Sequence, residues 1–396
     1  MENAINTLRI QNFKSIKDVT MKPRRVNLII GQPNVGKSNI LEAMSLLSGI
    51  FPRPGSQQQE DTGRYYGGIL RYHEVRQLFY DNNTRKPVAV ETNSDICVLA
   101  HNYATGNGFR YVLAERDTWE KMRDSVVFKK WGAMPNDAEE TRLINYLPEW
   151  VKENTKPYPQ YILSEFHGNG HVSRNDGVSS HGTAPYAGTR IVRPYLFSPP
   201  KRIVGEDSTP YLRPPTGENL IQIIESNPIL RQKIARMFEP YGLRLLIRID
   251  ERRLEVIKDL DGVIYSYPYS SIADTLQRII FYLAAIESND DAVILLEEPE
   301  AHSYPVYVSM LGRRMVESRN NQFFVATHSP YLITEVLEQM LPDEQQAQEL
   351  AIFVAYYEDY QTKVKQLSDE EVRAIRNDGL DVFYNMDRYV PRPVNG

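Results

Sequence analysis

Runs of mostly apolar residues occur at three points of the chain, and each is followed at once by polar residues or glycine. They are VNLII at residues 26–30, AVILL at 292–296 and QFFVA at 322–326. Runs of this length, bounded by turn residues, are typical of strands buried on both faces, as in a parallel sheet. A helical pattern follows each run. This alternation predicts an α/β fold with a mostly parallel central sheet.

The rest of the pattern divides the chain into four parts. Residues 1–50 hold two alternating strands before the first buried run, which predicts an antiparallel N-terminal lobe. Residues 51–190 are rich in Gly, Tyr, Asn and Pro, and predict an α+β insertion with a long polar loop. Strand and helix patterns alternate again in residues 191–340. Residues 341–396 add two strands and a helix that begins after Ser368, with acidic residues in its first turn.

The first buried run ends in a phosphate-binding loop with the pattern G-x-x-x-x-G-K-S. Backbone N–H groups of such a turn and of the following helix N-terminus converge on an anion, the lysine adds charge, and the serine hydroxyl serves Mg²⁺. The motif could occur by chance, but here a strand precedes it and a helix follows it. Phosphate binding requires this order of strand, turn and helix. The sequence therefore predicts that ATP and Mg²⁺ bind here, at Gly31, Asn34, Gly36, Lys37, Ser38 and Asn39.

The second buried run ends in two carboxylates, Glu297 and Glu298, within the motif EEPEAH. Ligands of open α/β sheets bind at the carboxyl ends of the parallel strands. We expect Glu297 to lie near the Mg²⁺ held by Ser38, and Glu298 to polarise the attacking water or take its proton. Carboxylates after a strand are often only solvated charges. Beside a P-loop, a catalytic pair is the better explanation.

The third buried run ends in THSP, which places His328 at the same edge of the predicted sheet. A histidine there donates a hydrogen bond to a γ-phosphate oxygen, whereas a lone histidine in a strand is more often structural. Its position after two other strand-end motifs favours the role of γ-phosphate sensor. The helix that follows tolerates Pro330 in its first turn.

Composition narrows the class of protein. The chain has 396 residues, 41% of them hydrophobic, which suffices for about two domains with a sizeable core. Its longest apolar stretches, such as residues 279–286, are far too short to span a membrane, and no signal pattern opens the sequence. A single cysteine, Cys97, excludes an internal disulfide and favours the cytoplasm. The net charge of −5 gives no general signal for nucleic acid, although local basic patches exist.

The order of these motifs resembles the ABC-type ATPase heads of the RecF, Rad50 and SMC group. It is most similar to the OLD-family and AAA15-type ATPases of bacterial anti-phage systems, such as the AriA-like subunits of PARIS defence. The similarity lies in the opening LRIQNFKSIKDVTMKPRRVNLIIGQPNVGKSNILEAM, in EEPEAHSYP and in THSPYLI. It covers residues 1–50 and 190–385. The resemblance implies an ATP-driven homodimer or higher oligomer in which each nucleotide lies between the P-loop of one subunit and the signature segment of the other.

The signature segment departs from that family pattern. The equivalent stretch, residues 267–288, carries hydroxyls at Ser271 and Thr275 but no glycine. Its helix N-terminus still offers N–H groups to a phosphate across the interface, although the missing glycine limits close backbone approach. The alternative is an ordinary core helix with an apolar inner face. No glutamine can be assigned to the family's Q-loop.

Two features that the sequence lacks narrow the functional prediction. Residues 51–190 show no heptads for a coiled-coil arm, and about sixty residues after THSP are too few for the nuclease domain of OLD-type proteins. The resemblance therefore implies an ATPase switch that controls a separate effector, expected to be a nuclease. The alternatives are a RecF-type ATPase that clamps duplex DNA, supported only by local positive charge at residues 192–203 and 236–253, and a nucleotide-gated scaffold with little turnover.

Overall fold

The computed structural model describes residues 1–48, 70–102, 108–124, 161–166, 172–174, 192–199, 209–377 and 382–390. Of the α+β insertion expected at residues 51–190, most of the long polar loop, at residues 167–189, lies outside the described residues. Among the described residues, no helix combines the length and apolar character needed to cross a membrane.

A six-stranded sheet forms the centre of the molecule, in the order β16-β15-β3-β14-β13-β9. All neighbouring pairs are parallel except β15 and β16. Every residue of β3 and β14 is buried, as their mostly apolar sequences predict, and the polar residues Asn27 and Gln322 are buried with the rest. The predicted α/β class and mostly parallel sheet are confirmed. The strands are β3 (Val26–Ile30), β9 (Val192–Tyr195), β13 (Val293–Glu297), β14 (Gln322–Ala326), β15 (Leu350–Glu358) and β16 (Gln361–Gln366).

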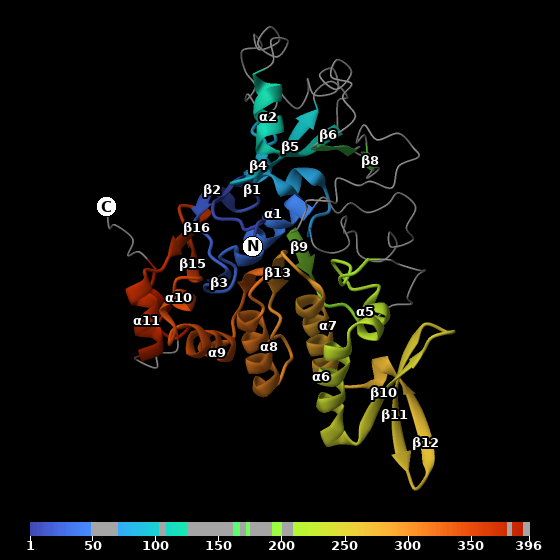
Figure 1. Ribbon diagram of the computed structural model, residues 1–396. Coiled ribbons are helices and arrows are strands. Elements are labelled where there is room, and N and C mark those ends of the chain that lie inside the picture. Colours follow the sequence, from blue (N-terminus) through green and yellow to red (C-terminus); the bar gives the residue numbers. More distant parts are fainter. Residues whose placement is uncertain are drawn as a thin grey trace.

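Both faces of this sheet are covered, which gives two hydrophobic cores. Leu28 and Ile30 of β3 belong to the core beneath the larger group of helices, whereas Ile29 belongs to the core that contains α1 (Lys37–Ser45). Figure 1 shows α1 between the central sheet and the N-terminal lobe, with α7, α8 and α9 on the opposite side. The other helices are α5 (Leu220–Ser226), α6 (Pro228–Phe238), α7 (Asp274–Ser288), α8 (Pro305–Glu317), α9 (Pro330–Met340), α10 (Glu344–Ala347) and α11 (Asp369–Asn377).

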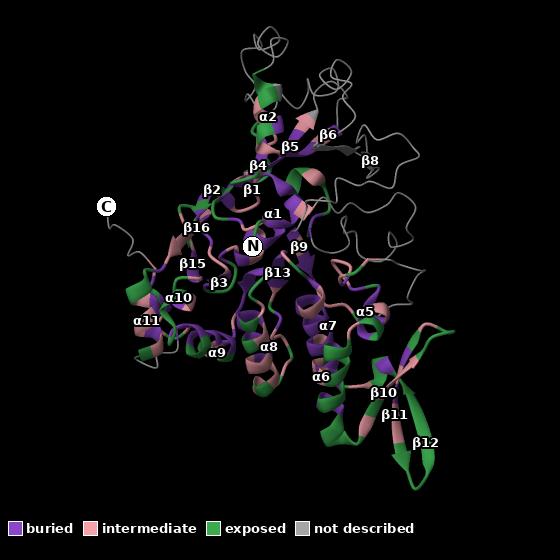
Figure 2. Ribbon diagram, in the orientation of Figure 1, coloured by how far each residue is buried: buried purple, intermediate pink, exposed green. Residues whose placement is uncertain are grey.

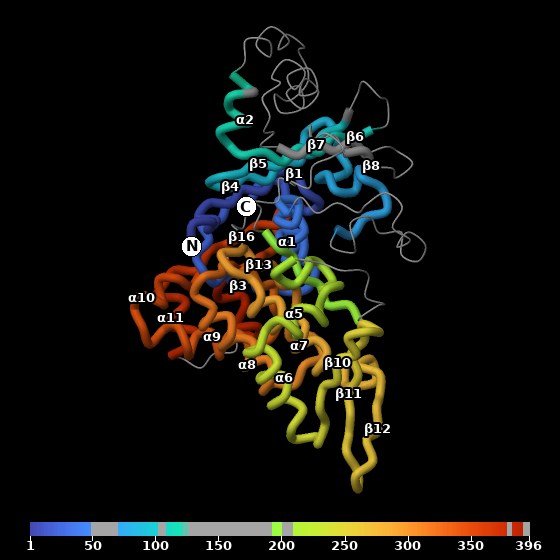
Figure 3. Tube along the Cα trace, turned by 45° about the vertical axis from the view of Figure 1, so that its right-hand side comes forward, coloured from blue at the N-terminus to red at the C-terminus, as the bar shows by residue number. Residues whose placement is uncertain are grey.

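The N-terminal lobe is an antiparallel sheet of seven strands, in the order β2-β1-β4-β5-β6-β7-β8. Strand β1 pairs with both β2 and β4, so strands from residues 51–190 continue the sheet that residues 1–50 begin. Figure 3 shows this sheet above α1 and the central sheet, with α2 (Arg116–Arg123) at its outer side. The strands are β1 (Leu8–Phe13), β2 (Ile16–Met21), β4 (Val88–Thr92), β5 (Asp95–Asn102), β6 (Gly108–Glu115), β7 (Tyr161–Phe166) and β8 (Val172–Arg174).

A third sheet projects from the helical side of the molecule. It consists of β10 (Leu243–Arg248), β11 (Arg253–Leu260) and β12 (Val263–Pro268), paired antiparallel in that order. All residues of β12 are exposed, and Figure 2 shows the outer strand in the colour of exposed residues. Three consecutive antiparallel strands differ from the strand–helix alternation expected for residues 191–340.

Short 3-10 turns connect the main elements. They lie at Leu46–Ser48, Val75–Leu78, Tyr80–Asn82, Glu239–Tyr241, Tyr269–Ser271 and Met386–Arg388. The predicted C-terminal strands β15 and β16 and the helix α11 are present. Ser368 starts α11 as expected: its hydroxyl accepts the N–H of Glu371, whose carboxylate accepts the N–H of Ser368.

Candidate functional site

The P-loop lies between β3 and α1, and its glycines are required by both conformation and space. Gly31 and Gly36 have φ angles of +154° and +92°, and Asn34 also has a positive φ of 63°. A Cβ at Gly36 would lie 2.1 Å from Oγ1 of Thr362, and one at Gly31 would lie 2.3 Å from the carbonyl oxygen of Ala355. The loop therefore fits tightly against β15 and β16.

Lys37 is the buried cation of this loop. Its side chain donates hydrogen bonds from Nζ to the carbonyl oxygens of Gly31 (3.0 Å) and Gln32 (2.8 Å), and the residue is only 6% exposed. Burial lowers the pKa of Lys37 to about 8, while the negative charges of Glu298 and Glu297 act in the opposite direction. A bound phosphate would place a negative charge beside this buried ammonium group.

A chain of side-chain hydrogen bonds supports the P-loop from outside. The amide of Asn39 donates to Oγ of Ser15 (2.7 Å), which lies 2.7 Å from Oγ1 of Thr362; the Thr362 hydroxyl donates to the carbonyl of Val35 (2.8 Å). Asn39, expected to contact nucleotide, here binds Ser15. Sequence reasoning missed Ser15 and Thr362, because their contacts join residues 347 positions apart.

The two predicted carboxylates follow β13 and point to different partners. Glu298 has a positive φ of 42°, a conformation uncommon for a residue with a side chain, and its N–H donates to the carbonyl of Ala326 (2.8 Å). Glu297 forms an ion pair with Arg71, whose Nη2 lies 2.5 Å from its Oε1. Arg71 lies outside every predicted motif.

His328 lies at the end of the neighbouring strand, beside Glu298. Its Nε2 is 3.7 Å from Oε1 of Glu298, and the two side chains are 37% and 49% exposed. Burial, followed by the positive charge of Lys37, lowers the pKa of His328 below its ordinary value, whereas Glu298 raises it. The imidazole is therefore neutral at pH 7, with one N–H donor for a phosphate oxygen.

A third glutamate, Glu300, connects the two strand ends. Its Oε1 accepts hydrogen bonds from the hydroxyl of Thr327 (2.6 Å) and the N–H of His328 (2.8 Å). Burial raises the pKa of Glu300, although these hydrogen bonds oppose the shift. Glu300 belongs to the motif EEPEAH, but the sequence analysis assigned it no role. The signal that could have identified it is a third carboxylate after a buried strand. Glu300 positions His328 through the backbone.

The residues predicted for the signature segment, Ser271 and Thr275, form their hydrogen bonds away from the P-loop. Ser271 donates to the carbonyl of Pro268 (2.6 Å), and Thr275 donates to the carbonyl of His302 (2.6 Å). Within the described residues, neither forms a hydrogen bond with the P-loop. Both line an apolar cavity of about 720 Å³, together with Tyr304, with Tyr307 of α8 and with residues of β10–β12. A single copy of the chain does not bring these hydroxyls to its own P-loop.

The arrangement fits a Mg²⁺-bound nucleoside triphosphate. The glycine turn leaves a cradle free of Cβ atoms, α1 begins directly after it, and a buried lysine lies within the field of both Glu297 and Glu298. The side chains of Ser38 and Glu297 carry oxygen atoms of the hard type that Mg²⁺ prefers. The structure thus groups the P-loop residues with Glu297, Glu298 and His328, and leaves Ser271 and Thr275 apart.

Comparisons with known proteins agree with this geometry. Residues 4–127 match the family AAA_15, an AAA ATPase domain, and residues 183–334 match AAA_21, described as "AAA domain, putative AbiEii toxin, Type IV TA system". An "ATP/GTP phosphatase" of Helicobacter pylori is 20% identical over 365 residues, which cover 90% of this chain and 93% of that protein. Together with the site described above, the two domain matches support ATP hydrolysis by this chain.

Solved structures of SMC heads are also similar to this chain. The head domain from Pyrococcus furiosus, bound to the C-terminal domain of ScpA, has a TM-score of 0.45 and 13% identity, covering 94% of this chain and 98% of that one. The SMC head domain from Thermotoga maritima has a TM-score of 0.38 and 12% identity, covering 92% and 99%.

Proposed function

We propose that two copies of this chain close over ATP and that hydrolysis of the nucleotide acts as a molecular switch. The observation that carries the proposal is the contrast in exposure at the site. Lys37 is buried, whereas Glu298 and His328 keep 49% and 37% of their side chains exposed. One copy supplies a binding cradle but leaves the reacting end open to solvent. A second copy would exclude water there, which strengthens every electrostatic interaction.

Each residue has a role that follows from its chemistry. Lys37, the glycine turn and the N-terminus of α1 would bind the phosphates, while Ser38 and Glu297 would hold Mg²⁺, which neutralises phosphate charge when bound. Glu298 would take the proton of the attacking water, and neutral His328 would donate a hydrogen bond to the γ-phosphate. Asn34, exposed at the tip of the P-loop, would approach the nucleotide from the outside.

The second copy would contribute its signature segment. Ser271 and Thr275 lie around the start of α7, where free N–H groups and hydroxyls favour an anion. The hydroxyl of Thr275 now donates to His302, so closure would exchange this bond for one to nucleotide. Homodimerisation, or a higher homo-oligomer, is therefore part of the proposal.

The output of the switch would be a separate effector, in our proposal a nuclease of a cytoplasmic anti-phage system. The similarity of the motifs to OLD-family and AAA15-type ATPases supports this assignment. So does the match to a family described by a putative toxin of a toxin–antitoxin system, which is a two-component arrangement.

The substitution Glu298→Gln tests the catalytic assignment. The amide keeps the size of the side chain but cannot take a proton, so we expect turnover to fall by at least about a hundredfold while ATP binding is retained. An ATP-dependent dimer should accumulate, measurable by light scattering. Glu370→Gln, an exposed carboxylate on α11, serves as the control with normal turnover. Normal turnover in the Glu298 variant would refute the role of Glu298.

A RecF-type DNA clamp is the competing proposal, and one observation weighs against it. Residues 236–253 suggested a basic patch, but three of their five arginines form ion pairs: Arg244 with Asp259 (3.9 Å), Arg248 with Glu255 (2.8 Å) and Arg253 with Glu251 (3.3 Å). Duplex DNA binding with and without ATP, measured over a range of salt concentrations, separates the proposals. A steep salt dependence would favour the clamp, because phosphate contacts release counterions.

A further inference from the structure

Arg71 is the strongest unexplained feature of the site, because it lies outside all the motifs and yet contacts the carboxylate assigned to Mg²⁺. Its Nη2 is 2.5 Å from Oε1 of Glu297. The two side chains are 41% and 23% exposed, so the pair lies at the border between site and solvent. A charge-assisted contact of this kind occupies the oxygen that a metal ion would need.

The base of the Arg71 side chain is held in place independently of Glu297. Its Nε donates to Oε1 of Glu42 (3.0 Å), and its backbone N–H donates to Oε2 of the same residue (3.1 Å). Glu42 belongs to α1, the helix that begins with Lys37, and its side chain is only 4% exposed. Lys14 also pairs with Glu42 and donates to the carbonyl of Arg71 (2.8 Å). The buried anchor leaves Nη2 as the part that reaches Glu297.

The segment that carries Arg71 is joined to the N-terminal lobe. Lys14, in the turn between β1 and β2, donates its N–H to the carbonyl of Leu78 (3.0 Å), and Phe13 forms a β-bridge with Phe79. Arg71 therefore connects three parts of the molecule: the P-loop helix through Glu42, the end of β13 through Glu297, and the antiparallel sheet through its own segment.

We propose that Arg71 is a resident counter-ion of Glu297 that a divalent metal must displace. The inference rests on the assignment of Glu297 to Mg²⁺ in the proposed function and adds a regulatory step to it. Without metal, the guanidinium neutralises Glu297 and holds its carboxylate beside the P-loop. With metal, one cation replaces the other, and Nη2 is released while Nε stays on Glu42. Metal binding is thereby coupled to the 70–82 segment and to the antiparallel sheet.

The test is direct metal binding to the full chain without nucleotide. Mn²⁺ replaces Mg²⁺ as the probe, and its free concentration is read from its EPR signal. We expect Arg71→Gln to bind Mn²⁺ about fivefold more tightly than the wild type, the factor that an ion pair of modest strength supplies. Arg71→Lys keeps the positive charge and should remain close to the wild type. Arg76→Gln, exposed and paired with Glu74, is the matched control and should not change the affinity.

Glu297→Gln separates this inference from the proposed function. If it abolishes Mn²⁺ binding and Arg71→Gln does not tighten binding, the counter-ion role is refuted and the metal site stands. If Glu297→Gln leaves Mn²⁺ binding intact, the metal assignment itself is wrong. Thermal unfolding of each variant shows whether the fold is retained, and a folded Arg71→Gln protein with unchanged Mn²⁺ affinity overturns the proposal.

Discussion

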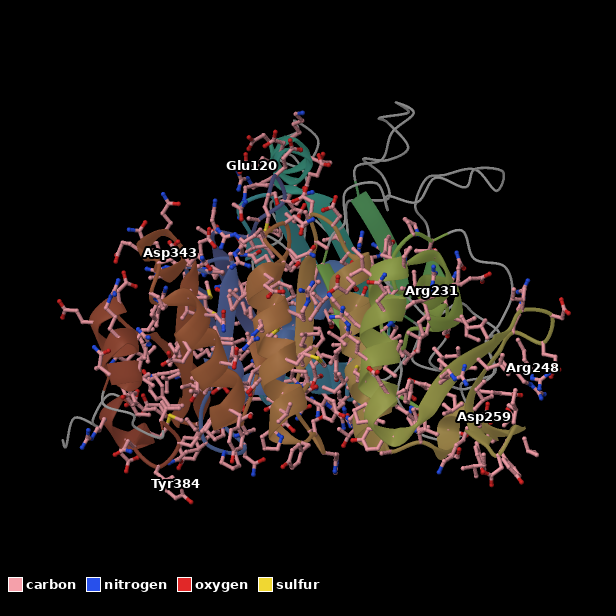
Figure 4. All side chains as sticks on the ribbon, turned by 60° about the horizontal axis from the view of Figure 1, so that its bottom comes forward. Glu120, Arg231, Arg248, Asp259, Asp343 and Tyr384 are labelled. Carbon is pink, nitrogen blue, oxygen red and sulfur yellow. The ribbon has the colours of Figure 1, made fainter. Side chains whose placement is uncertain are left out.

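The central sheet and the β10–β12 sheet differ in how far their strands are buried. Strands β3 and β14 are buried along their whole length and end in functional side chains, whereas every residue of β12 is exposed. Figure 4 labels Arg248 and Asp259 in the region of the projecting sheet, where charged side chains gather. In the central sheet packing positions the chemistry. In the projecting sheet, Leu254 and Val256 of β11 pack into the core, whereas the side chains of β12 are exposed.

This contrast predicts unequal costs of substitution. The largest effect is expected for Phe324→Ala, because Phe324 in β14 is completely buried in the core shared with α1. The loss of the ring and the cavity left behind should lower the free energy of unfolding by about 3–5 kcal/mol. Urea unfolding measures the change. A loss of less than about 1 kcal/mol in the free energy of unfolding would mean that this core tolerates the substitution as well as a surface position does.

A smaller effect is expected where polar contacts join two strand ends. Glu300→Ala leaves the hydroxyl of Thr327 and the N–H of His328 without their acceptor, which should cost about 1–3 kcal/mol. Glu300→Gln retains an acceptor and removes a buried charge, so it should stay near the wild type. Thermal unfolding and ATP turnover of both variants check this. Equal behaviour of the two variants would show that Glu300 does not position His328.

The smallest effect is expected in the projecting sheet. Ile264 in β12 is 64% exposed, and Ile264→Thr keeps the β-branched shape that suits a strand. The free energy of unfolding should change by less than about 0.5 kcal/mol, measured by the same urea titration. A change above about 2 kcal/mol would show that a partner or a second copy covers this strand, and would remove the contrast between the two sheets.

The motifs at the central sheet were predictable because local and global signals coincide there. A buried strand needs an apolar run, and the polar residue that ends the run must lie at the sheet edge. This reasoning located Lys37, Glu297, Glu298 and His328 at one edge, and their mutual influence on pKa places them together. Parallel strands bring their carboxyl ends together, so the order of motifs along the chain contained most of the site.

The supporting residues were not predictable, because their contacts depend on how distant segments pack. Arg71 meets Glu297 across 226 positions, and Ser15 meets Thr362 across 347. Neither segment has a pattern of its own that indicates a phosphate or a metal. The β10–β12 sheet was missed for a different reason. Its arginines suggested a basic patch, whereas cross-strand carboxylates such as Glu255 neutralise them.

The neighbours of β3 also set the order in which the nucleotide site can form. This strand lies between β14 and β15, and Gly36 rests against Thr362 of β16. During synthesis the P-loop leaves the ribosome long before these three strands exist, and at about 5–20 residues per second the wait lasts tens of seconds. We therefore expect the nascent chain to acquire its affinity for nucleotide only when its last strands dock against β3 and the P-loop.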